Sequence, residues 1–397
     1  MDALMLPLNW QRVRLGDIAE IIGGGTPSTQ ITSFWNGSIN WFTPTEIGIT
    51  KYVYKSQRTI TPLGLKNSSA KLLPIGTILL TSRANIGDCA ILKVVATTNQ
   101  GFQSLIPLEK INNEFLCYLI LTLKNKLLKL ASGSTFLEVS PNKIKNLLIP
   151  LPPLNEQIAI ANILSDLDRY LCTLDALILK KEGVKKALSF ELLSQRKRLK
   201  GFNQAWQRVK VKDFGIIITG STPLTQISEY WNGTISWITP TDINDNKDIF
   251  NSERKITQKG LDTIRMIPKN SVLVTCIASI GKNAILRVNG ACNQQINAII
   301  PNKDFNADFI YYLMENNRQY LLGKAGVTAT YIISKQVFEE IDFFVPKDLN
   351  EQSAIANILS DLDNEIASLK NKKRQFENIK KALNHDLMSA KIRVLKQ

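Results

Sequence analysis

Apolar residues follow the spacing of a long amphipathic helix in two separate stretches of the chain. In the first stretch, alternating steps of four and three residues join Ile160, Leu164, Leu167, Leu171, Leu174 and Ile178. In the second stretch, the same steps join Ile355, Leu359, Leu362, Ile366 and Leu369, and the series continues at Phe376. Such heptad spacing is typical of coiled coils, in which two helices bury their apolar stripes against each other.

The two stretches are copies of each other. Residues 155–168 read NEQIAIANILSDLD, and residues 350–363 differ from them only by Ser353 in place of Ile158. Because matched stripes favour packing of one copy on the other, the sequence predicts that the two helices pair as an antiparallel coiled coil. The alternative is that each helix packs only on its own domain.

Residues that favour helix caps predict where the two long helices begin and where the first one ends. Asn155 and Asn350 are suited to cap the N-termini, and Gly201 is suited to end the first helix after Lys200. A helix of that extent would be about 65 to 70 Å long. This is more than one globular domain needs.

The duplication extends over the whole chain. WQRV at residues 10–13 returns at residues 206–209, an offset of 206 − 10 = 196, and the offset is 195 at the helices. Each half is therefore one folded unit followed by one long helix, with pseudo-twofold symmetry. The predicted boundaries are a first domain at 1–153, a first helix at 154–201, a second domain at 202–348 and a second helix at 349–397.

Short β-prone runs and short helical stretches alternate within each unit. Residues 75–81 are typical of a buried strand and residues 113–130 of a helix, and both patterns return in the second unit. The Asn-Gly pairs at 36–37 and 232–233 lie between β-prone runs and predict hairpin turns. The fold class is therefore α+β, with mixed strands and short helices in each domain.

The net charge of the chain indicates which kind of partner it binds. Lysine and arginine total 49 against 34 for aspartate and glutamate, which gives a net charge of +15 and a pI of 9.5. This surplus favours polyanions, with nucleic acid first and an acidic protein or membrane surface second. The chain shows no signal-peptide pattern and no apolar run long enough to span a membrane, so we expect a cytoplasmic protein.

Residue chemistry argues against an enzyme. The five cysteines are scattered without a CxxC pair and are expected to be reduced core residues, and His385 is the only histidine. One histidine excludes HExxH sites, and its place near the end of the second long helix argues against a histidine-based triad, so we expect no catalytic residue, no metal and no bound cofactor. The sequence has no Walker phosphate loop, and the glycines at 23–25 are interpreted as a flexible turn.

Polar loops between the strands carry the candidate DNA-binding residues. In the first unit these are Thr26, Ser28, Thr43, Thr45, Glu46, Ser82, Arg83, Asn85, Asn99, Gln100, Gln103, Ser134 and Thr135. In the second unit they are Thr222, Thr225, Thr239, Thr241, Asp242, Ser279, Lys282, Asn293, Gln294, Asn297, Thr328 and Thr330. Such side chains can read base edges or hold phosphates, whereas in the alternative interpretation they only cap turns. The loops recur at matching positions while their letters differ, which suits two readers of different short sequences.

Several segments carry a resemblance that covers essentially the whole chain. They are WQRVRLGDIAEIIGGGTPS, INWFTPTEI, ISWITPTDI, GTILLTSRANIG, NQGFQSLIP and PLPPLNEQIAIANILSDLD. These segments resemble the DNA-specificity subunit of Type I restriction-modification enzymes, in which two target-recognition domains alternate with two helices. The second copy departs from the pattern, because it has VPKDLNEQ where the first has LPPLNEQ.

The resemblance implies a non-catalytic subunit whose two target-recognition domains bind the halves of a bipartite, asymmetric double-stranded DNA target. The helices would set the separation of the domains. It also implies two modification subunits that methylate adenine, and two ATP-dependent restriction subunits that can join them. S-adenosylmethionine, ATP and Mg²⁺ are expected on these partners and not on this chain.

Two other hypotheses remain open. The chain could be a repeat scaffold that binds proteins and whose basic charge is incidental, or a self-contained nuclease with an unrecognised site. DNA affinity that falls steeply with ionic strength would favour a DNA reader over a scaffold. Magnesium-dependent cutting without a partner would reveal a nuclease.

Overall fold

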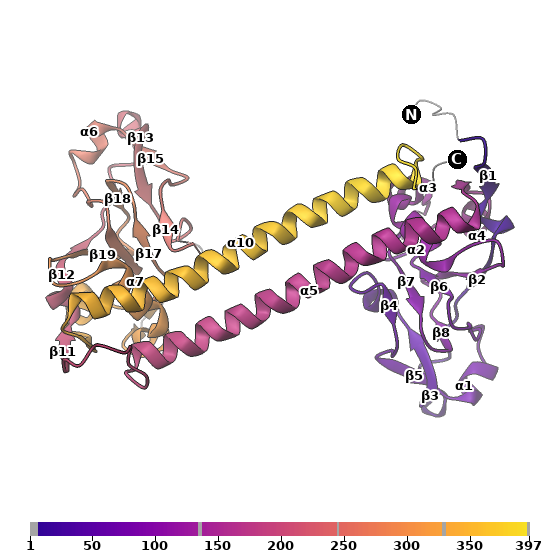
Figure 1. Cartoon of the computed structure of the whole chain (residues 1–397), viewed down its shortest axis with the longest axis horizontal. Helices are drawn as coiled ribbons and strands as arrows, with labels where there is room; N and C mark the ends of the chain where they lie inside the picture. The colour runs from indigo at the N-terminus through magenta and orange to yellow at the C-terminus, as the bar shows by residue number, and fades with distance from the viewer. Residues whose placement is uncertain (1–6, 134–136, 244–245, 328–330, 395–397) are drawn as a thin grey trace. The chain divides into compact units, whose positions relative to one another are not determined.

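The computed structural model describes residues 7–133, 137–243, 246–327 and 331–394. The chain divides into two compact units, Met1–Asp175 with Asn371–Gln397 and Ala176–Lys370. The two long helices are labelled α5 and α10 in Figure 1, and each contributes one part to each unit.

Among its described residues, the first unit has ten short strands, and several short helices precede the first long helix. The strands are β1 (Gln11–Arg14), β2 (Ala19–Gly23), β3 (Trp35–Phe42), β4 (Tyr52–Val53), β5 (Arg58–Ile60), β6 (Ile78–Leu80), β7 (Cys89–Leu92), β8 (Ala96–Thr98), β9 (Gln103–Pro107) and β10 (Leu148–Leu151). The helices are η1 (Leu15–Asp17), η2 (Thr32–Phe34), η3 (Pro44–Glu46), α1 (Pro62–Lys66), α2 (Asn113–Thr122), α3 (Lys124–Leu130), α4 (Pro141–Lys145) and α5 (Leu154–Leu193).

The second unit repeats this order. Its strands are β11 (Trp206–Lys210), β12 (Gly215–Thr219), β13 (Trp231–Ile238), β14 (Asp248–Ile249), β15 (Lys255–Ile256), β16 (Ser271–Thr275), β17 (Asn283–Leu286), β18 (Gly290–Cys292), β19 (Ile296–Pro301), β20 (Gly326–Val327), β21 (Tyr331–Ile332) and β22 (Asp342–Pro346). Its helices are η4 (Val211–Phe214), η5 (Ser228–Tyr230), α6 (Gln258–Leu261), α7 (Ala307–Asn316), α8 (Arg318–Leu322), α9 (Lys335–Glu340) and α10 (Leu349–Met388).

Both units contain the same mixed sheets, which confirms the predicted α+β class. A five-stranded sheet has the order β2-β9-β6-β7-β4 in the first unit and β12-β19-β16-β17-β14 in the second. A three-stranded sheet, β5-β3-β8 or β15-β13-β18, accompanies it, and β1 pairs with β10 as β11 pairs with β22. The pairings β3 with β8 and β4 with β7 are parallel, whereas β6 is antiparallel to both of its neighbours.

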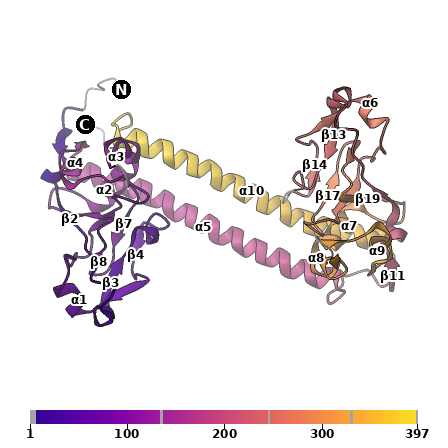
Figure 2. The ribbon, with the colours of Figure 1, turned by 180° about the vertical axis from the view of Figure 1, so that it is seen from behind.

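Strand β6 shows why the central strands have unbroken apolar sequences. Ile78 and Leu80 belong to a core that includes α2 and the beginning of α5, while Leu79 belongs to a second core with Phe42 and Phe102. Because both faces of the strand are covered, alternation of polar and apolar residues is not needed. In both views α2 lies beside α5 (Figure 1, Figure 2).

The long helices pack together antiparallel within each unit. In the first unit Asp168 of α5 pairs with Lys380 of α10, and seven residues further along α5 Asp175 lies 2.6 Å from Lys373. The partner moves back along α10 as the position moves forward along α5. In the second unit Lys185 lies 2.5 Å from Asp363.

The predicted seam residues are buried or half-buried, and the first residues of each seam also pack on a domain. They are Ile160, Leu164, Leu167, Leu171, Leu174, Ile178, Ile355, Leu359, Leu362, Ile366, Leu369 and Phe376. Ile160 and Leu164 belong to the core of the first domain, as Ile355 and Leu359 belong to that of the second. The predicted pairing of the helices is therefore confirmed, and the beginning of each seam packs on a domain as well.

The helix ends differ from the sequence expectation. Helix α5 ends at Leu193, ahead of Gln195, whose φ of 59° leaves the helical region, and not at Lys200. At about 1.5 Å per residue its 40 residues span about 60 Å. Asn155 lies inside the first turn, where the carbonyl of Pro153 accepts from Glu156 N at 3.0 Å. The predicted cap is therefore two positions too late, because the helix begins at Leu154 and the Pro153 carbonyl accepts its first hydrogen bonds.

The Asn-Gly pairs form bulges and not hairpin turns. Asn36 has a φ of 62°, and the register of β3 against β5 shifts so that Ile60 faces both Trp35 and Ile39. A Cβ atom on Gly37 would lie 2.6 Å from the Ile60 carbonyl oxygen, so the close approach of two backbones requires glycine. The sequence signal for positive φ was correct, but its interpretation as a strand reversal was wrong.

Candidate nucleic-acid interface

The polar loops predicted from sequence contact one another at one edge of the first unit. Gly25 N donates to Thr98 O at 2.8 Å, and Asn99 N donates to Phe42 O at 3.0 Å. Ser82 N donates to the carbonyl of Gly101 at 2.8 Å. These bonds join the segments that follow β2, β3, β6 and β8 into one cluster.

The second unit repeats the cluster bond by bond. Ser221 N donates to Cys292 O at 2.8 Å, Asn293 N to Ile238 O at 2.9 Å, and Cys276 N to Gln295 O at 2.8 Å. The backbone frame is therefore the same in both units, although the side chains at the loop tips differ.

The candidate residues fall into four groups by exposure. Exposed side chains belong to Thr26, Ser28, Thr45, Arg83, Asn85, Gln100, Thr222, Thr225, Thr241 and Gln294. Half-buried ones belong to Thr43, Glu46, Asn99, Thr239, Asp242, Ser279 and Lys282. Buried ones belong to Ser82, Gln103, Asn293 and Asn297. Ser134, Thr135, Thr328 and Thr330 lie outside the described residues.

The buried candidates support the loops from inside. The Ser82 hydroxyl donates to Gly101 O at 3.1 Å, and the Asn297 amide donates to Cys276 Sγ at 3.2 Å. Asn293 Oδ1 accepts from the backbone N–H of Gln295 at 3.1 Å. These buried polar groups bond to other parts of the protein.

The predicted carboxylates also bond to their own loops. Glu46 accepts from the N–H of Thr43 at 2.7 Å, from its hydroxyl at 2.8 Å, and from the N–H of Gln57 at 2.7 Å. Asp242 accepts in the same way from Thr239 and from Glu253 N. Both carboxylates therefore fix the shape of a tight turn, as in a capping box.

The exposed candidates present polar groups at the surface of the cluster. The Thr26 hydroxyl donates to Gln100 Oε1, which joins the loop after β2 to the loop before β9. In the second unit Thr222 donates to Gln294 Oε1 at 2.6 Å, which joins the loop after β12 to the loop before β19. Arg83 lies 3.0 Å from Glu138, a pair that only the first unit has among the described residues. The amide N–H₂ groups of the two glutamines remain as donors to a partner.

Two tryptophans in each unit support the loops by hydrogen bonds, and the sequence did not lead us to predict this role. Trp41 Nε1 donates to Gly25 O at 2.8 Å and Trp35 Nε1 to Ser28 O at 3.0 Å. In the second unit Trp237 and Trp231 make the same bonds, to Ser221 O and Leu224 O. The repeated spacing of the tryptophans, at the offset of 196, was the signal that could have identified them.

The NEQ segment at each helix entry is a structural clamp. Buried Glu156 accepts from Trp10 Nε1 at 3.1 Å and from Arg393 Nε at 2.8 Å. Gln157 donates to Pro152 O at 2.9 Å and accepts from Asn112 N at 2.8 Å. The clamp fastens the domain to the beginning of α5 and to the segment after α10.

The second unit carries the matching clamp. Glu351 accepts from Trp206 Nε1 at 3.2 Å and from Arg198 Nη2 at 2.8 Å. Gln352 accepts from Asn306 N at 3.0 Å. The departure from LPPLNEQ to VPKDLNEQ therefore leaves the clamp intact, and Asp348 Oδ1 accepts from Asn350 N at 2.8 Å at the helix entry.

A polar network joins the first domain to both long helices. Lys51 Nζ lies 2.8 Å from both Tyr118 Oη and Ser165 Oγ, and Tyr118 donates to Asp168, which also pairs with Lys380. Burial, followed by the bond to Asp168, raises the pKa of Tyr118. Burial alone would lower the pKa of Lys51, but its bonds with Tyr118 and a glutamate raise it. These shifts keep Lys51 charged and Tyr118 neutral.

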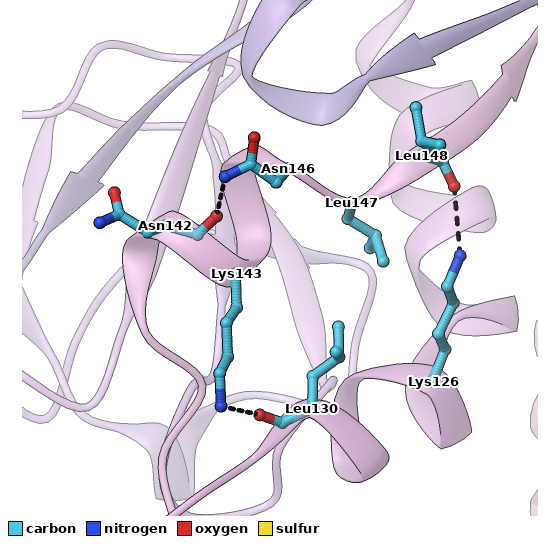
Figure 3. Close-up of a pocket in the computed structure, with 7 residues that line it drawn as sticks. All are labelled: Lys126, Leu130, Asn142, Lys143, Asn146, Leu147 and Leu148. Atoms are coloured by element: carbon cyan, nitrogen blue, oxygen red, sulfur yellow. Dashed lines mark hydrogen bonds between the residues drawn. The ribbon is translucent and has the colours of Figure 1, made fainter.

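A cavity of about 440 Å³ in the first unit offers no reactive group (Figure 3). Lys143 Nζ donates to Leu130 O at 2.8 Å, and Lys126 Nζ donates to Leu148 O at 3.3 Å, so both ammonium groups hold the backbone. The lining, which also includes Asn142, Asn146 and Leu147, contains no acidic residue, histidine or cysteine.

The described residues contain neither a metal-binding cluster nor a membrane-spanning helix. Across residues 7–133, 137–243, 246–327 and 331–394, acidic, histidine and cysteine side chains form no group that could hold a metal ion. Over the same ranges no helix combines the length and apolar character that a bilayer crossing requires.

Comparison with known proteins decides the family. The family described as Type I restriction modification DNA specificity domain matches residues 7–181 and again residues 203–378. The chain belongs to this family. Its members are the specificity subunits, the non-catalytic part of a Type I complex, and each match in this specificity subunit contains one loop cluster.

Curated relatives carry the same description. The chain is 42% identical over 171 residues to the MjaIX specificity subunit of Methanocaldococcus jannaschii, across 42% of this chain and 40% of that one. It is 36% identical over 161 residues to the EcoR124I/EcoR124II specificity subunit of Escherichia coli, again across 40% of that protein. With the MjaVIII specificity subunit of M. jannaschii, the alignment covers 99% of this chain and 95% of the relative at 26% identity.

Solved structures share the fold. The S subunit of a Type I system from M. genitalium aligns with a TM-score of 0.59 at 16% identity, over 96% of this chain and 98% of that one. The HsdS subunit from Thermoanaerobacter tengcongensis aligns with a TM-score of 0.56 at 18% identity, over 98% of both chains. At such identities the likeness establishes the specificity-subunit fold and not the bases that are read.

Proposed function

We propose that this chain reads a bipartite, asymmetric DNA target through its two target-recognition domains and takes no direct part in catalysis. The observation that carries the proposal is the pair of loop clusters, which share one backbone frame while their exposed tips differ. A shared frame with different tips suits two readers of different short sequences. The proposed domain boundaries are 1–153 and 202–348, and the segments 154–201 and 349–397 contain the helices α5 and α10.

The exposed and half-buried loop residues are the proposed base and phosphate readers. Gln100 and Gln294 can donate to and accept from an adenine edge, and Arg83 and Lys282 can hold guanine or phosphate. The buried candidates are proposed to act only by shaping the loops; they are Ser82, Gln103, Asn293 and Asn297. The net charge of +15 supports attraction to the DNA backbone.

The paired helices are proposed to set the spacing between the half-sites and to receive the modification subunits. Ile158, Leu179 and Ile379 are exposed apolar residues on helices whose seams are already buried, so further apolar surface remains for a partner. S-adenosylmethionine, ATP and Mg²⁺ are proposed to bind modification and restriction subunits. Such a complex would work in the cytoplasm.

Selection from randomised DNA duplexes tests the proposal. The chain would be co-expressed with its modification subunit, and the retained DNA would be sequenced. Two short motifs at one fixed spacing are the expected result. A folded complex that enriches no sequence would contradict the proposal and favour a protein-binding scaffold.

Heptad insertion tests the role of the helices. One heptad inserted in register into both α5 and α10 should lengthen the preferred spacer, by about 10 Å of helix, and leave both half-site motifs unchanged. A change in the motifs themselves would show that the helices take part in base reading.

A further inference from the structure

An exposed arginine is stacked on a tryptophan beside the reading loops of the first domain. The guanidinium carbon of Arg58 lies 3.8 Å from the centre of the Trp35 ring. Trp41 stands edge-on to Trp35, with 5.0 Å between ring centres, and its own centre lies 5.3 Å from the guanidinium. We name Arg58, Trp35 and Trp41 the arginine platform of the first domain.

The second domain has the same platform. Arg254 lies 4.1 Å from the Trp231 ring centre and 4.8 Å from that of Trp237, and the two rings are again perpendicular. Stacking of a guanidinium on an indole stabilises one orientation of an otherwise flexible side chain. The arginines are therefore pre-oriented at matching positions in the two domains.

The donors of both guanidinium groups are available. Within the described part of the chain, neither the Arg58 nor the Arg254 guanidinium makes a hydrogen bond or an ion pair, and both side chains are exposed. Arg287 provides a contrast, because Asp248 and Asp308 lie 2.6 and 2.7 Å from its nitrogens. Stacking blocks only the faces of a guanidinium, so the N–H groups at its edge can still donate to an anion.

Each platform is built into the reading loops. Trp35 donates to Ser28 O in the loop after β2, and Gln57 N, next to Arg58, donates to Glu46 in the loop after β3. Ser56 fixes the strand itself, since its hydroxyl donates to Arg58 O at 2.6 Å. The arginine thus stands between two loops that carry candidate readers, on a backbone that does not need to rearrange.

We propose that Arg58 and Arg254 each hold a phosphodiester group of the DNA backbone, once per half-site and independently of base sequence. This inference rests on the proposed function and assigns a ligand to one residue in each domain. The loop tips differ between the domains while the platform is the same, so the platform suits the part of DNA that is common to both half-sites. A guanidinium matches phosphate oxygens with two parallel hydrogen bonds.

Salt titration of DNA binding tests the assignment. Arg58→Ala and Arg254→Ala would be made singly and together in the full chain co-expressed with its modification subunit. Each change should weaken binding on the order of tenfold and reduce the slope of log affinity against log salt by about 1. The double variant should lose about 2 from the slope, while both enriched motifs stay the same.

Two further variants separate charge from stacking and position. Arg58→Lys keeps the charge but loses the planar stack and fork, so the salt slope should stay near the wild-type value while affinity still falls. Arg196→Ala is the matched control, because Arg196 is also an exposed arginine over an aromatic ring, 4.7 Å from Phe190, but lies in the segment after α5 and belongs to neither loop cluster. It should leave affinity and slope unchanged.

The outcomes separate this inference from the proposed function. If the wild-type complex enriches a bipartite motif and the alanine variants match it in affinity and slope, the platforms do not hold phosphate. A changed base at one motif position would make Arg58 or Arg254 a base reader and would equally overturn the assignment. If the wild-type complex binds DNA without any sequence preference, the proposed function fails, and the slopes on a single duplex still decide the arginines. Absence of any DNA binding would refute both.

Discussion

The clamp at the beginning of α5 can be tested by Glu156→Gln. Glutamine keeps the size of the side chain but offers one oxygen to the three hydrogen bonds that Trp10 and Arg393 now donate to the carboxylate. Its amide N–H₂ group would also face a donor. At least one of the two partners must lose its acceptor, and the negative charge beside Arg393 disappears.

The expected cost follows from burial. Glu156 is 1% exposed and Trp10 is 5% exposed, so an unpaired indole N–H is not rescued by water. Arg393 keeps 26% of its side-chain exposure, so solvent partly replaces its ion pair. Loss of charged hydrogen bonds at such a site costs about 2 kcal/mol, toward the lower part of the range for buried pairs.

Hydrogen exchange followed by mass spectrometry measures this cost locally. Peptides from β1, β10 and the first turns of α5 should exchange about 30-fold faster, which corresponds to about 2 kcal/mol in local opening. Peptides around Glu351 in the second unit, which has its own clamp, serve as an internal reference. Asp166→Asn is the matched control, because Asp166 and Arg169 form an exposed pair that solvent screens.

Two results would refute the reasoning. Exchange as slow as in Asp166→Asn would mean that the clamp contributes little to the attachment of the helix. Equal acceleration in both units would mean that the substitution acts on the whole chain and not on this junction.

Three further predictions concern thiols, glycines and acid stability. In the native protein a thiol reagent should modify Cys172, the exposed one among five cysteines, and all five should react after denaturation. Gly183→Ala should stabilise the chain by about 0.5 to 1 kcal/mol, since the new Cβ meets nothing within 4 Å and helical glycine is unfavourable. Gly25→Ala should destabilise it, because its Cβ would lie 2.3 Å from Ala70 N. Burial alone would raise the pKa of Asp308, but Lys247 and an arginine lower it, so Asp308→Asn should weaken the fold at neutral pH and remove part of its acid lability.

The sign of the acid effect is fixed by the direction of the shift. A carboxyl whose pKa is lower in the folded state stabilises the fold above its unfolded pKa of about 4, and this contribution is lost as pH falls through the folded pKa. Urea unfolding between pH 7 and 3 measures it, and parallel stability curves for wild type and variant would contradict the prediction. Fast labelling of a second thiol, or thermal melting of the two glycine variants in the reverse order, would contradict the others.

The sequence by itself determined the architecture. The heptad steps from Ile160 to Ile178 and their copy from Ile355 identify the long helices, because a periodic apolar stripe must be buried whatever surrounds it. The repeated offset divides the chain into matching halves, and repeated motifs such as NEQ are the ones by which the chain resembles its family. Local and repeated patterns of this kind can be recognised in the sequence without knowledge of the tertiary structure.

Only the tertiary structure decided which polar residues face outward. Glu46 and Gln100 look equally suited to read a base, but Glu46 bonds to its own turn whereas Gln100 is exposed at the cluster surface. The partner of Glu156 is Arg393, 237 residues away, and no local pattern links them. Hydrogen-bond partners distant in sequence are chosen by how the sheets and helices bring backbone and side chains together, so exposure, clamps and the arginine platforms could not be predicted from residue type alone.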